Sequence, residues 1–430
     1  LGALTTAPIT LNGGFSDNAD DGNGLGLFFA AQINSVEEQV YTHGDVTSWD
    51  NNRVVFDMGG TDRVQRAGNF ILKSTGTAAP SVIEFRNWND RVVAKVGTIT
   101  FDADWAILNV LNNNGRGRSS TLKPDALAGT GKTIEQLGNG LMELSGLTTT
   151  LSNSTYTVSQ GVLRVKDGAS LGTDNMFVIG QGATLEIAAA NFAPIGTTTV
   201  VQKWGSGERW NVEDARGTGN YTLPQGVTLQ LNTSVVPSSP RTITLDGGSI
   251  EGFLYNDSVA PAVFRYLGPN VTVDLASDSF IGQNFEVGID GVDAGRTGVY
   301  PDLQPDTGTI TGAILVVEGA ITGSGKTLTK TGRDMVILAG ANSYGNTVVD
   351  QGILRLGATD TLPTGGILTT RFDGWVDMNG FNQTVANLGT KDGDPSPGGV
   401  GLDYSGAIRN SAYTDSVLTA GNADNHTYMG

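Results

Sequence analysis

Two short glycine–lysine motifs contain the residue types that bind phosphate in nucleotide-binding loops. They are GTGKT at 129–133 and GSGKT at 323–327. Such a loop needs a further glycine five residues before the Gly-Lys pair, so that its backbone amides can surround the phosphates. Ala126 and Ala320 occupy those positions. Because the motif also occurs twice, we interpret each copy as a turn of a structural repeat that carries a surface lysine.

Acidic residues beside basic ones are the second candidate chemistry, because polysaccharide hydrolysis or elimination needs such a cluster. Asp102 and Asp104 lie on one side of an expected strand, Asp20–Asp21 are adjacent, and RVK at 164–166 is a basic pair. The equivalent repeat position holds RLG at 355–357, which makes the basic pair ordinary variation. We therefore predict no catalytic residue, and keep a polysaccharide-active enzyme as a second alternative function.

Histidine and oxygen-rich loops give no cofactor site. His43 and His426 stand in polar contexts, and no Gly-x-Ser-x-Gly elbow accompanies them. The segments NADDGNG (18–24) and KDGDPSPGG (391–399) carry oxygen donors for calcium. Neither matches an EF-hand or a calcium-binding β-helix repeat, and Asp, Asn and Gly are also the ordinary residues of turns. The prediction is no cofactor and no metal site, with calcium as the alternative.

Exposed tryptophans can stack on sugars, and the chain has six: Trp49, Trp88, Trp105, Trp204, Trp210 and Trp375. Trp105 and Trp375 lie in strand-like runs, so we expect them in the core. Trp204 and Trp210 flank a Gly-Ser-Gly-Glu loop, which makes them the better surface candidates. Surface glycans are therefore a partner to test.

Composition limits the class of protein. The chain has 430 residues, no cysteine and a formal charge of −17, which argues against nucleic acid and anionic membranes as partners. No apolar run is long enough for a membrane-spanning helix. The first residue is Leu1 and no signal peptide is present, so we expect a processed chain or a segment of a longer one.

The segments that carry these residues are predicted to be short strands. β-Branched and aromatic runs such as RVVFDM (53–58) are bounded by Gly, Asn and Asp, and the best helical candidate is only 32–41. Glycine, at 61 residues, is about twice as frequent as usual. These features predict a β-solenoid with roughly 20–25 residues per coil. A set of β-sandwich domains is the competing fold, but no spacing of about 100 residues supports it.

A duplicated unit supports the solenoid. At an offset of 194, Gly129, Gly131, Lys132, Gly138 and Leu144 fall on Gly323, Gly325, Lys326, Gly332 and Leu338. After a three-residue gap in one loop the offset becomes 191, and Gln160, Gly161, Leu163 and Arg164 meet Gln351, Gly352, Leu354 and Arg355. A gap confined to a turn is what a repeated structural unit leaves behind.

The second copy also carries a recognisable pattern. Its positions are Gly323, Gly325, Leu328, Lys330, Gly332, Leu338, Gly340, Asn342, Tyr344, Gly345, Thr347, Val349, Gly352 and Leu354. This order resembles the autotransporter-associated β-strand repeat, also called the passenger-associated transport repeat, of bacterial surface proteins. Residues 376–389, 410–430 and 1–14 resemble neighbouring segments of that family. The first copy departs from the pattern with Gln136 in place of the family lysine.

The resemblance implies an exported, right-handed parallel β-helix with lateral loops, on or outside a Gram-negative-type cell, and no particular activity. We divide the chain into a divergent β region (1–126), a first repeat unit (127–190), solenoid with inserted loops (191–320), a second repeat unit (321–395) and a C-terminal strand segment (396–430). Severed units at both termini suggest stacking with further copies, because an open solenoid end exposes unpaired strand edges. The expected function is a non-enzymatic, self-assembling structural protein of a surface fibre, sheath or layer. An adhesin that displays loops 203–225 and 295–308 is the first alternative.

Overall fold

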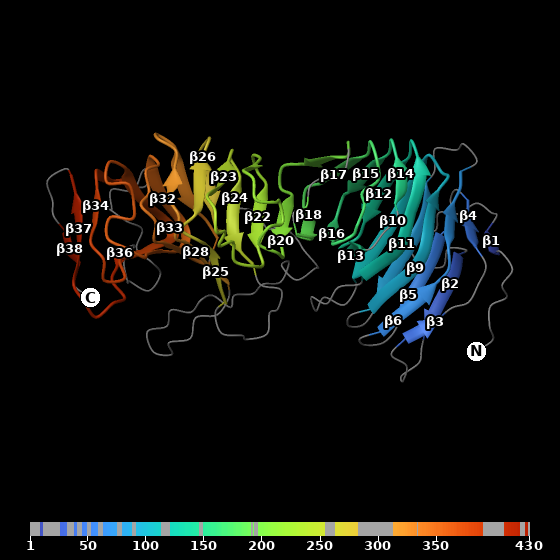
Figure 1. Cartoon of the computed structure of the whole chain (residues 1–430). Helices are drawn as coiled ribbons and strands as arrows, with labels where there is room; N and C mark the ends of the chain where they lie inside the picture. The colour runs from blue at the N-terminus through green and yellow to red at the C-terminus, as the bar shows by residue number, and fades with distance from the viewer. Residues whose placement is uncertain are drawn as a thin grey trace. The chain divides into compact units, whose positions relative to one another are not determined.

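A computed structural model describes residues 9–11, 26–31, 38–40, 45–49, 53–58, 63–74, 80–87, 92–112, 121–145, 149–190, 192, 197–253, 263–282, 313–332, 334–389, 408–421 and 426–428. Every regular element among these residues is a β-strand (Figure 1). The strands pair in parallel from one coil to the next, which confirms the all-β, parallel β-helix fold. The described residues up to Gly207 form one compact unit, and those from Glu208 onward form a second.

The first unit has three columns of strands, one strand of each coil lying in each column. The first column contains β3 (Glu38–Val40), β6 (Arg63–Ala67), β9 (Val92–Phe101), β11 (Thr121–Thr130), β13 (Leu141–Leu144), β16 (Gly161–Lys166) and β18 (Ala183–Ala188). The second contains β1 (Ile9–Leu11), β4 (Val46–Ser48), β7 (Phe70–Leu72), the ends of β9 and β11, and β14 (Thr150–Ser152).

The third column of this unit is a continuous parallel sheet. It contains β2 (Gly26–Ala31), β5 (Arg53–Met58), β8 (Ser81–Asn87), β10 (Trp105–Asn112), β12 (Thr133–Leu137), β15 (Thr155–Val158), β17 (Met176–Ile179) and β19 (Thr199–Gln202). Arg164 meets side chains of the neighbouring coils 21 and 22 residues away in the sequence, within the predicted coil length, whereas the earlier coils are longer, with Arg66 and Lys95 aligned 29 residues apart.

The second unit repeats this plan. Its strands are β20 (Gly207–Trp210, at the boundary), β21 (Tyr221–Leu223), β22 (Thr228–Leu231), β23 (Arg241–Leu245), β24 (Ser249–Gly252), β25 (Val263–Leu267), β26 (Val271–Leu275), β27 (Ser279–Ile281), β28 (Ala313–Val317), β29 (Ile321–Thr322), β30 (Thr327–Lys330), β31 (Met335–Leu338), β32 (Asn346–Leu356), β33 (Ile367–Asp377), β34 (Gln383–Val385), β35 (Asn387–Gly389), β36 (Ile408–Arg409), β37 (Ser416–Ala420) and β38 (His426–Tyr428). The long strands β32 and β33 each serve two columns.

The core lies inside the coils, where the period-2 alternation of each strand sends one apolar set inward. Met142, Leu163 and Leu185 stack on successive strands and are buried. Burial of each such side chain contributes roughly 1.5–3 kcal/mol. Yet all residues of β13, in the first unit, and of β28, in the second, are buried. The outward faces of these two strands are therefore covered as well.

Glycine turns mark the two copies of the repeat in the structure. Gly138 and its equivalent Gly332 have φ of 82° and 68°, and Gly161 and its equivalent Gly352 have φ of 74° and 66°. Residues with a Cβ rarely adopt such values. A Cβ at Gly161 would also collide with the carbonyl oxygen of Gly140 in the preceding coil. The glycines are thus required both by the turn and by the close approach of the next coil.

Two expectations need correction. The described part of the helical candidate at 32–41 is strand β3. Residues 191–245, which include the expected loop 203–225, contain five solenoid strands from β19 to β23. At the other end, β38 pairs with β37 in the antiparallel sense. Stacking of the termini with further copies stays a prediction.

Candidate functional site: a column of charged side chains

Charged side chains follow one outward-facing row of the first column. Strand pairing aligns Arg66 with Lys95, Lys95 with Lys123, and Glu143 with Arg164. Arg164 is in turn aligned with Glu186. The alternation of β13, β16 and β18 directs Met142, Leu163 and Leu185 inward, which leaves their sequence neighbours on the outer face. We call these six aligned residues, Arg66 to Glu186, the charged column.

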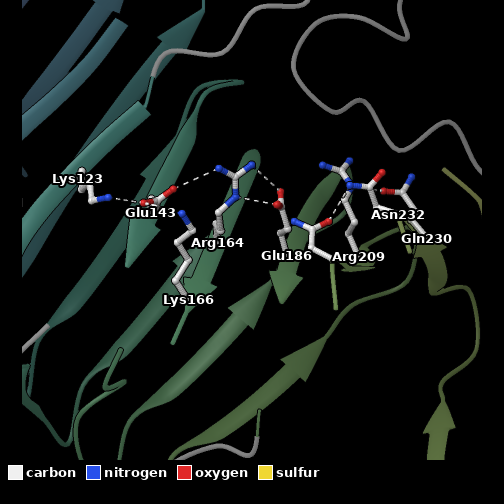
Figure 2. A network of polar contacts seen from close by, with 9 residues as sticks. Lys123, Glu143, Arg164, Lys166, Glu186, Arg209, Gln230 and Asn232 are labelled. Carbon is white, nitrogen blue, oxygen red and sulfur yellow. Dashed lines mark hydrogen bonds and ion pairs between the residues drawn. The ribbon is translucent and has the colours of Figure 1, made fainter. Parts of the chain in front are cut away.

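Ion pairs connect the later members of the charged column (Figure 2). Lys123 Nζ lies 2.6 Å from Glu143 Oε1, and Arg164 Nη1 lies 3.2 Å from Glu143 Oε2. Arg164 also donates from Nε to Glu186 Oε1 at 2.7 Å and from Nη2 to Glu186 Oε2 at 3.3 Å. Lys166, two residues along the strand from Arg164, is 3.6 Å from Glu143.

Burial differs between the two signs of charge. The side chains of Glu143 and Glu186 are 7% and 0% exposed, whereas those of Lys123, Arg164 and Lys166 are 31%, 20% and 44% exposed. Burial raises the pKa of the Glu143 carboxyl, but Lys123, Lys166 and Arg164 outweigh burial and lower that pKa below its usual value. The Glu143 carboxylate is therefore ionised at neutral pH, and cations form the surface that solvent reaches.

The repeat reproduces one part of the charged column. At the offset of 191, Arg164 and Glu186 correspond to Arg355 and Asp377, and the strand pairing aligns this second pair as well. Arg355 Nε donates to Asp377 Oδ2 at 2.9 Å. Ser411 donates to the same carboxylate from its Oγ at 2.7 Å and from its backbone N–H at 3.0 Å. An outward Arg–carboxylate pair is thus a feature of both copies and belongs to the scaffold.

The row of the second unit that leads to Arg355 is apolar where the charged column holds Lys123 and Glu143. It runs Tyr266, Val316, Ile337 and Arg355, so that Val316 and Ile337 take the places of Lys123 and Glu143, counted back from the Arg–carboxylate pair. Together with Ile314, Met335, Ile353 and Trp375 they form an outer-face apolar cluster. The lysines of the charged column are therefore not required to build this kind of coil.

A separate buried cluster occupies the second unit, around Glu208. Arg216 donates to Glu208 from Nε at 2.8 Å and from Nη2 at 2.6 Å. Trp210 Nε1 and Tyr221 Oη also donate to this carboxylate, at 2.7 and 2.8 Å. Burial raises the pKa of Glu208, but Arg216 and the other donors lower it overall. With its oxygens engaged by these donors, Glu208 is a structural anion and not a general base.

Lys330, at the lysine position of the pattern that the second copy resembles, is buried, whereas lysines usually lie at the surface. Lys330 is 1% exposed, and its Nζ donates to the carbonyl oxygens of Thr331, Gly332 and Gln351 at 2.7, 2.8 and 3.0 Å. Burial lowers the pKa of this amine to about 7. In the first copy the equivalent residue, Gln136, is also buried and donates to the carbonyl of Val162 at 3.1 Å. Both side chains thus hold a glycine turn from inside the coil.

The sequence candidates for carboxylate chemistry are separated in space by the fold. Asp102 and Asp104 are exposed at the corner between β9 and β10, where Asp102 is 4.0 Å from Lys73 and Asp104 is 3.1 Å from Lys132. The basic pair of RVK, Arg164 and Lys166, instead belongs to the charged column. From the sequence alone, this pair is interpreted as ordinary variation and its buried partners are missed, because the spacing between aligned residues changes from coil to coil.

The tryptophans also differ from expectation in part. Trp204 is 53% exposed, as expected for a surface candidate, whereas Trp210 is fully buried. Trp105, expected in the core, is 39% exposed because Ala106 and Leu108 take the inward positions of β10. Trp375 is partly buried against the outer-face apolar cluster. Trp88 lies outside the described residues.

Several expectations fall outside the described ranges: the calcium candidates 18–24 and 391–399, His43 and loop 295–308. In the ranges that are described, no group of three or more His, Asp or Glu side chains gathers to hold a metal ion. Nor does this part of the chain contain a helix long and apolar enough to cross a membrane. Comparisons of the chain with known protein families, with curated proteins and with solved structures find no match.

Proposed function

We propose that this chain is a non-enzymatic structural protein of a bacterial surface, a β-solenoid subunit that stacks with further copies into a fibre, sheath or layer. The observation that carries the proposal is the uniform parallel pairing of coil upon coil within each unit. A strand edge that accepts the next coil of its own chain has the geometry to accept a coil of another copy. Such a contact is heterologous, and it gives an open filament when it does not close into a ring.

The extracellular, Gram-negative-type location rests on the resemblance of the repeat at 323–354 to the passenger repeats of exported proteins. The lack of cysteine agrees with coils stabilised by the apolar core inside them rather than by disulfides. The buried scaffold pairs, Arg164–Glu186 and Arg355–Asp377, favour a rigid surface over a mobile catalytic one.

The experiment is electron microscopy of the native material, with light scattering of the purified chain over a range of concentrations. Regular fibres or a lattice would support the proposal. A monomer that persists at high concentration would refute it. Because β38 covers one edge of β37, a variant truncated before His426 should assemble more readily if that edge is the contact.

An adhesin is the second candidate, and the exposure of Trp204 favours it. Deletion of 203–225 is not a clean test, because this segment contains β20, β21 and the buried Glu208 cluster. W204A is the sharper variant. If the chain is an adhesin, W204A should lose binding to cells or glycans and keep any assembly. W210A cannot serve as its control because Trp210 is core, so W105A, which removes another exposed indole, is the matched variant.

A further inference from the structure

The charged column begins with like charges on neighbouring strands. Arg66, Lys95 and Lys123 are aligned on three successive coils, which are about 4.8 Å apart in a parallel sheet. Like charges that lie directly opposite each other on neighbouring strands are destabilising. Lys123 is neutralised by Glu143, whereas Lys95 has no carboxylate next to it in the row. An ion pair along the column therefore does not explain the lysine at this position.

The second unit shows that the fold does not need these cations. Counted back from its scaffold pair Arg355–Asp377, its row holds Val316 and Tyr266 at the strand positions where the charged column holds Lys123 and Lys95. The cations are thus an addition to one part of the solenoid. Residues with destabilising charges at positions where the fold accepts apolar side chains are characteristic of binding surfaces.

The charged column carries a net positive charge on a protein that is negative overall. Within the aligned row, four cations, Arg66, Lys95, Lys123 and Arg164, stand with two carboxylates, Glu143 and Glu186, whereas the chain as a whole carries −17. The carboxylates are buried and the exposed atoms belong to the cations. Lys166 Nζ, at 3.6 Å from Glu143, makes an ion pair but no short hydrogen bond there. Its donors remain available to a ligand.

We propose that the outer face of β6, β9, β11 and β16 is a binding site for a linear anionic polysaccharide, with Lys95, Lys123 and Lys166 as its principal contacts. Arg66, Lys95 and Lys123 repeat at the spacing of the coils, which suits a polymer with one anion per repeat unit laid along the column, and Lys166 follows two coils after Lys123. Carboxylated and sulfated polysaccharides share this chemistry.

Nucleic acid fits the site less well. Double-stranded DNA carries one charge per about 1.7 Å of its axis, far denser than one cation per coil, so the net charge of −17 opposes DNA more strongly than it opposes a polysaccharide with one anion per repeat unit. The column also presents no aromatic side chain on which the bases of a single strand could stack. This makes single-stranded DNA a discriminating competitor.

The test measures binding of the full chain to polygalacturonate, dextran sulfate, neutral dextran and single-stranded DNA at low salt. K95Q/K123Q should weaken binding of the charged glycans about tenfold, since each exposed ion pair contributes up to about 1 kcal/mol. It should also flatten the salt dependence. K203Q/K326Q, which removes the same charge elsewhere, should bind as the natural chain does, and K95R/K123R should retain binding. The stronger of the two charged glycans identifies carboxylate or sulfate as the recognised group.

Three results would overturn the proposal: no binding of either charged glycan, an equal loss in K203Q/K326Q, or tighter binding of DNA than of both glycans. A second readout separates a ligand contact from a structural residue. In the absence of polyanion, K95Q should be at least as stable to urea as the natural chain, because it removes a cation that has no carboxylate next to it in the row. A clear loss of stability in K95Q would assign Lys95 to the scaffold and count against the site.

Discussion

The buried lysine at position 330 makes the stability of the second repeat unit depend on pH. Lys330 has an ordinary pKa of 10.5 when unfolded, and burial lowers this pKa to about 7 in the folded chain. Between pH 7 and 10.5 the unfolded chain therefore holds a proton that the folded chain has released. Raising the pH through this window stabilises the folded state, and lowering the pH destabilises it.

The magnitude follows from the displacement of the pKa. Each pH unit inside the window changes the free energy of unfolding by at most about 1.4 kcal/mol. From pH 7.5 to pH 9.5 the expected gain is about 2–3 kcal/mol. The assay should stay below pH 9.5, because burial raises the pKa of Tyr156 and Tyr344, and ionisation of these tyrosines in the unfolded chain opposes the gain at higher pH.

The repeat provides matched variants. K330Q installs the residue of the first copy, Gln136, and should abolish the pH dependence while keeping a donor for the turn carbonyls. Q136K should create a similar dependence in the first copy. Urea unfolding at several pH values, with hydrogen exchange of β30 and β12 as local probes, measures both. A pH dependence that persists unchanged in K330Q would refute the assignment to Lys330.

Three further substitutions test the buried contacts. R164M leaves Glu186 buried without its bidentate partner and should destabilise the chain by about 3–5 kcal/mol, measured by urea unfolding; a loss below about 1 kcal/mol would mean that the pair is solvated. G161A forces a Cβ into a turn with positive φ and against the neighbouring coil, and should lower the melting temperature, unlike alanine at the open position Gly182, where only φ is strained. E208Q leaves Arg216 without its anion and should cost about 3–5 kcal/mol, with a change in tryptophan fluorescence; unchanged fluorescence and stability would contradict the buried ion pair.

The sequence predicts the architecture well because turn glycines and strand alternation are local signals. The glycines at 138 and 332 predict equivalent turns, and the structure gives both positive φ. Alternation in TLTK (327–330) also indicates that Lys330 points inward with Leu328, although a charged residue discourages that conclusion. Local sequence pattern therefore predicts the coil, and strict alternation along the strand also predicts that Lys330 is buried.

The candidate site could not be read from the sequence in the same way. Lys95, Lys123, Glu143 and Glu186 are far apart in the chain, and only the register of pairing between coils aligns them. The outer face of the column is also partly covered, so outward position did not imply solvation. For Trp105 the error was one of phase, since a shift of one residue exchanges the inward and outward faces of a strand.

The alternating charges from Lys123 to Glu186 restrict how many coils can be removed from this part of the solenoid, or added to it, without loss of ion pairs. Arg164 separates Glu143 from Glu186. Removal of the coil that carries Arg164 would place two buried carboxylates on adjacent strands. Removal of that coil together with the one that carries Glu143 would instead bring Lys123 opposite Glu186 and restore an ion pair. In this part of the solenoid, coils should therefore be lost or gained in pairs. Two coils, and not one, are the unit by which this part of the chain can change its length and keep its ion pairs.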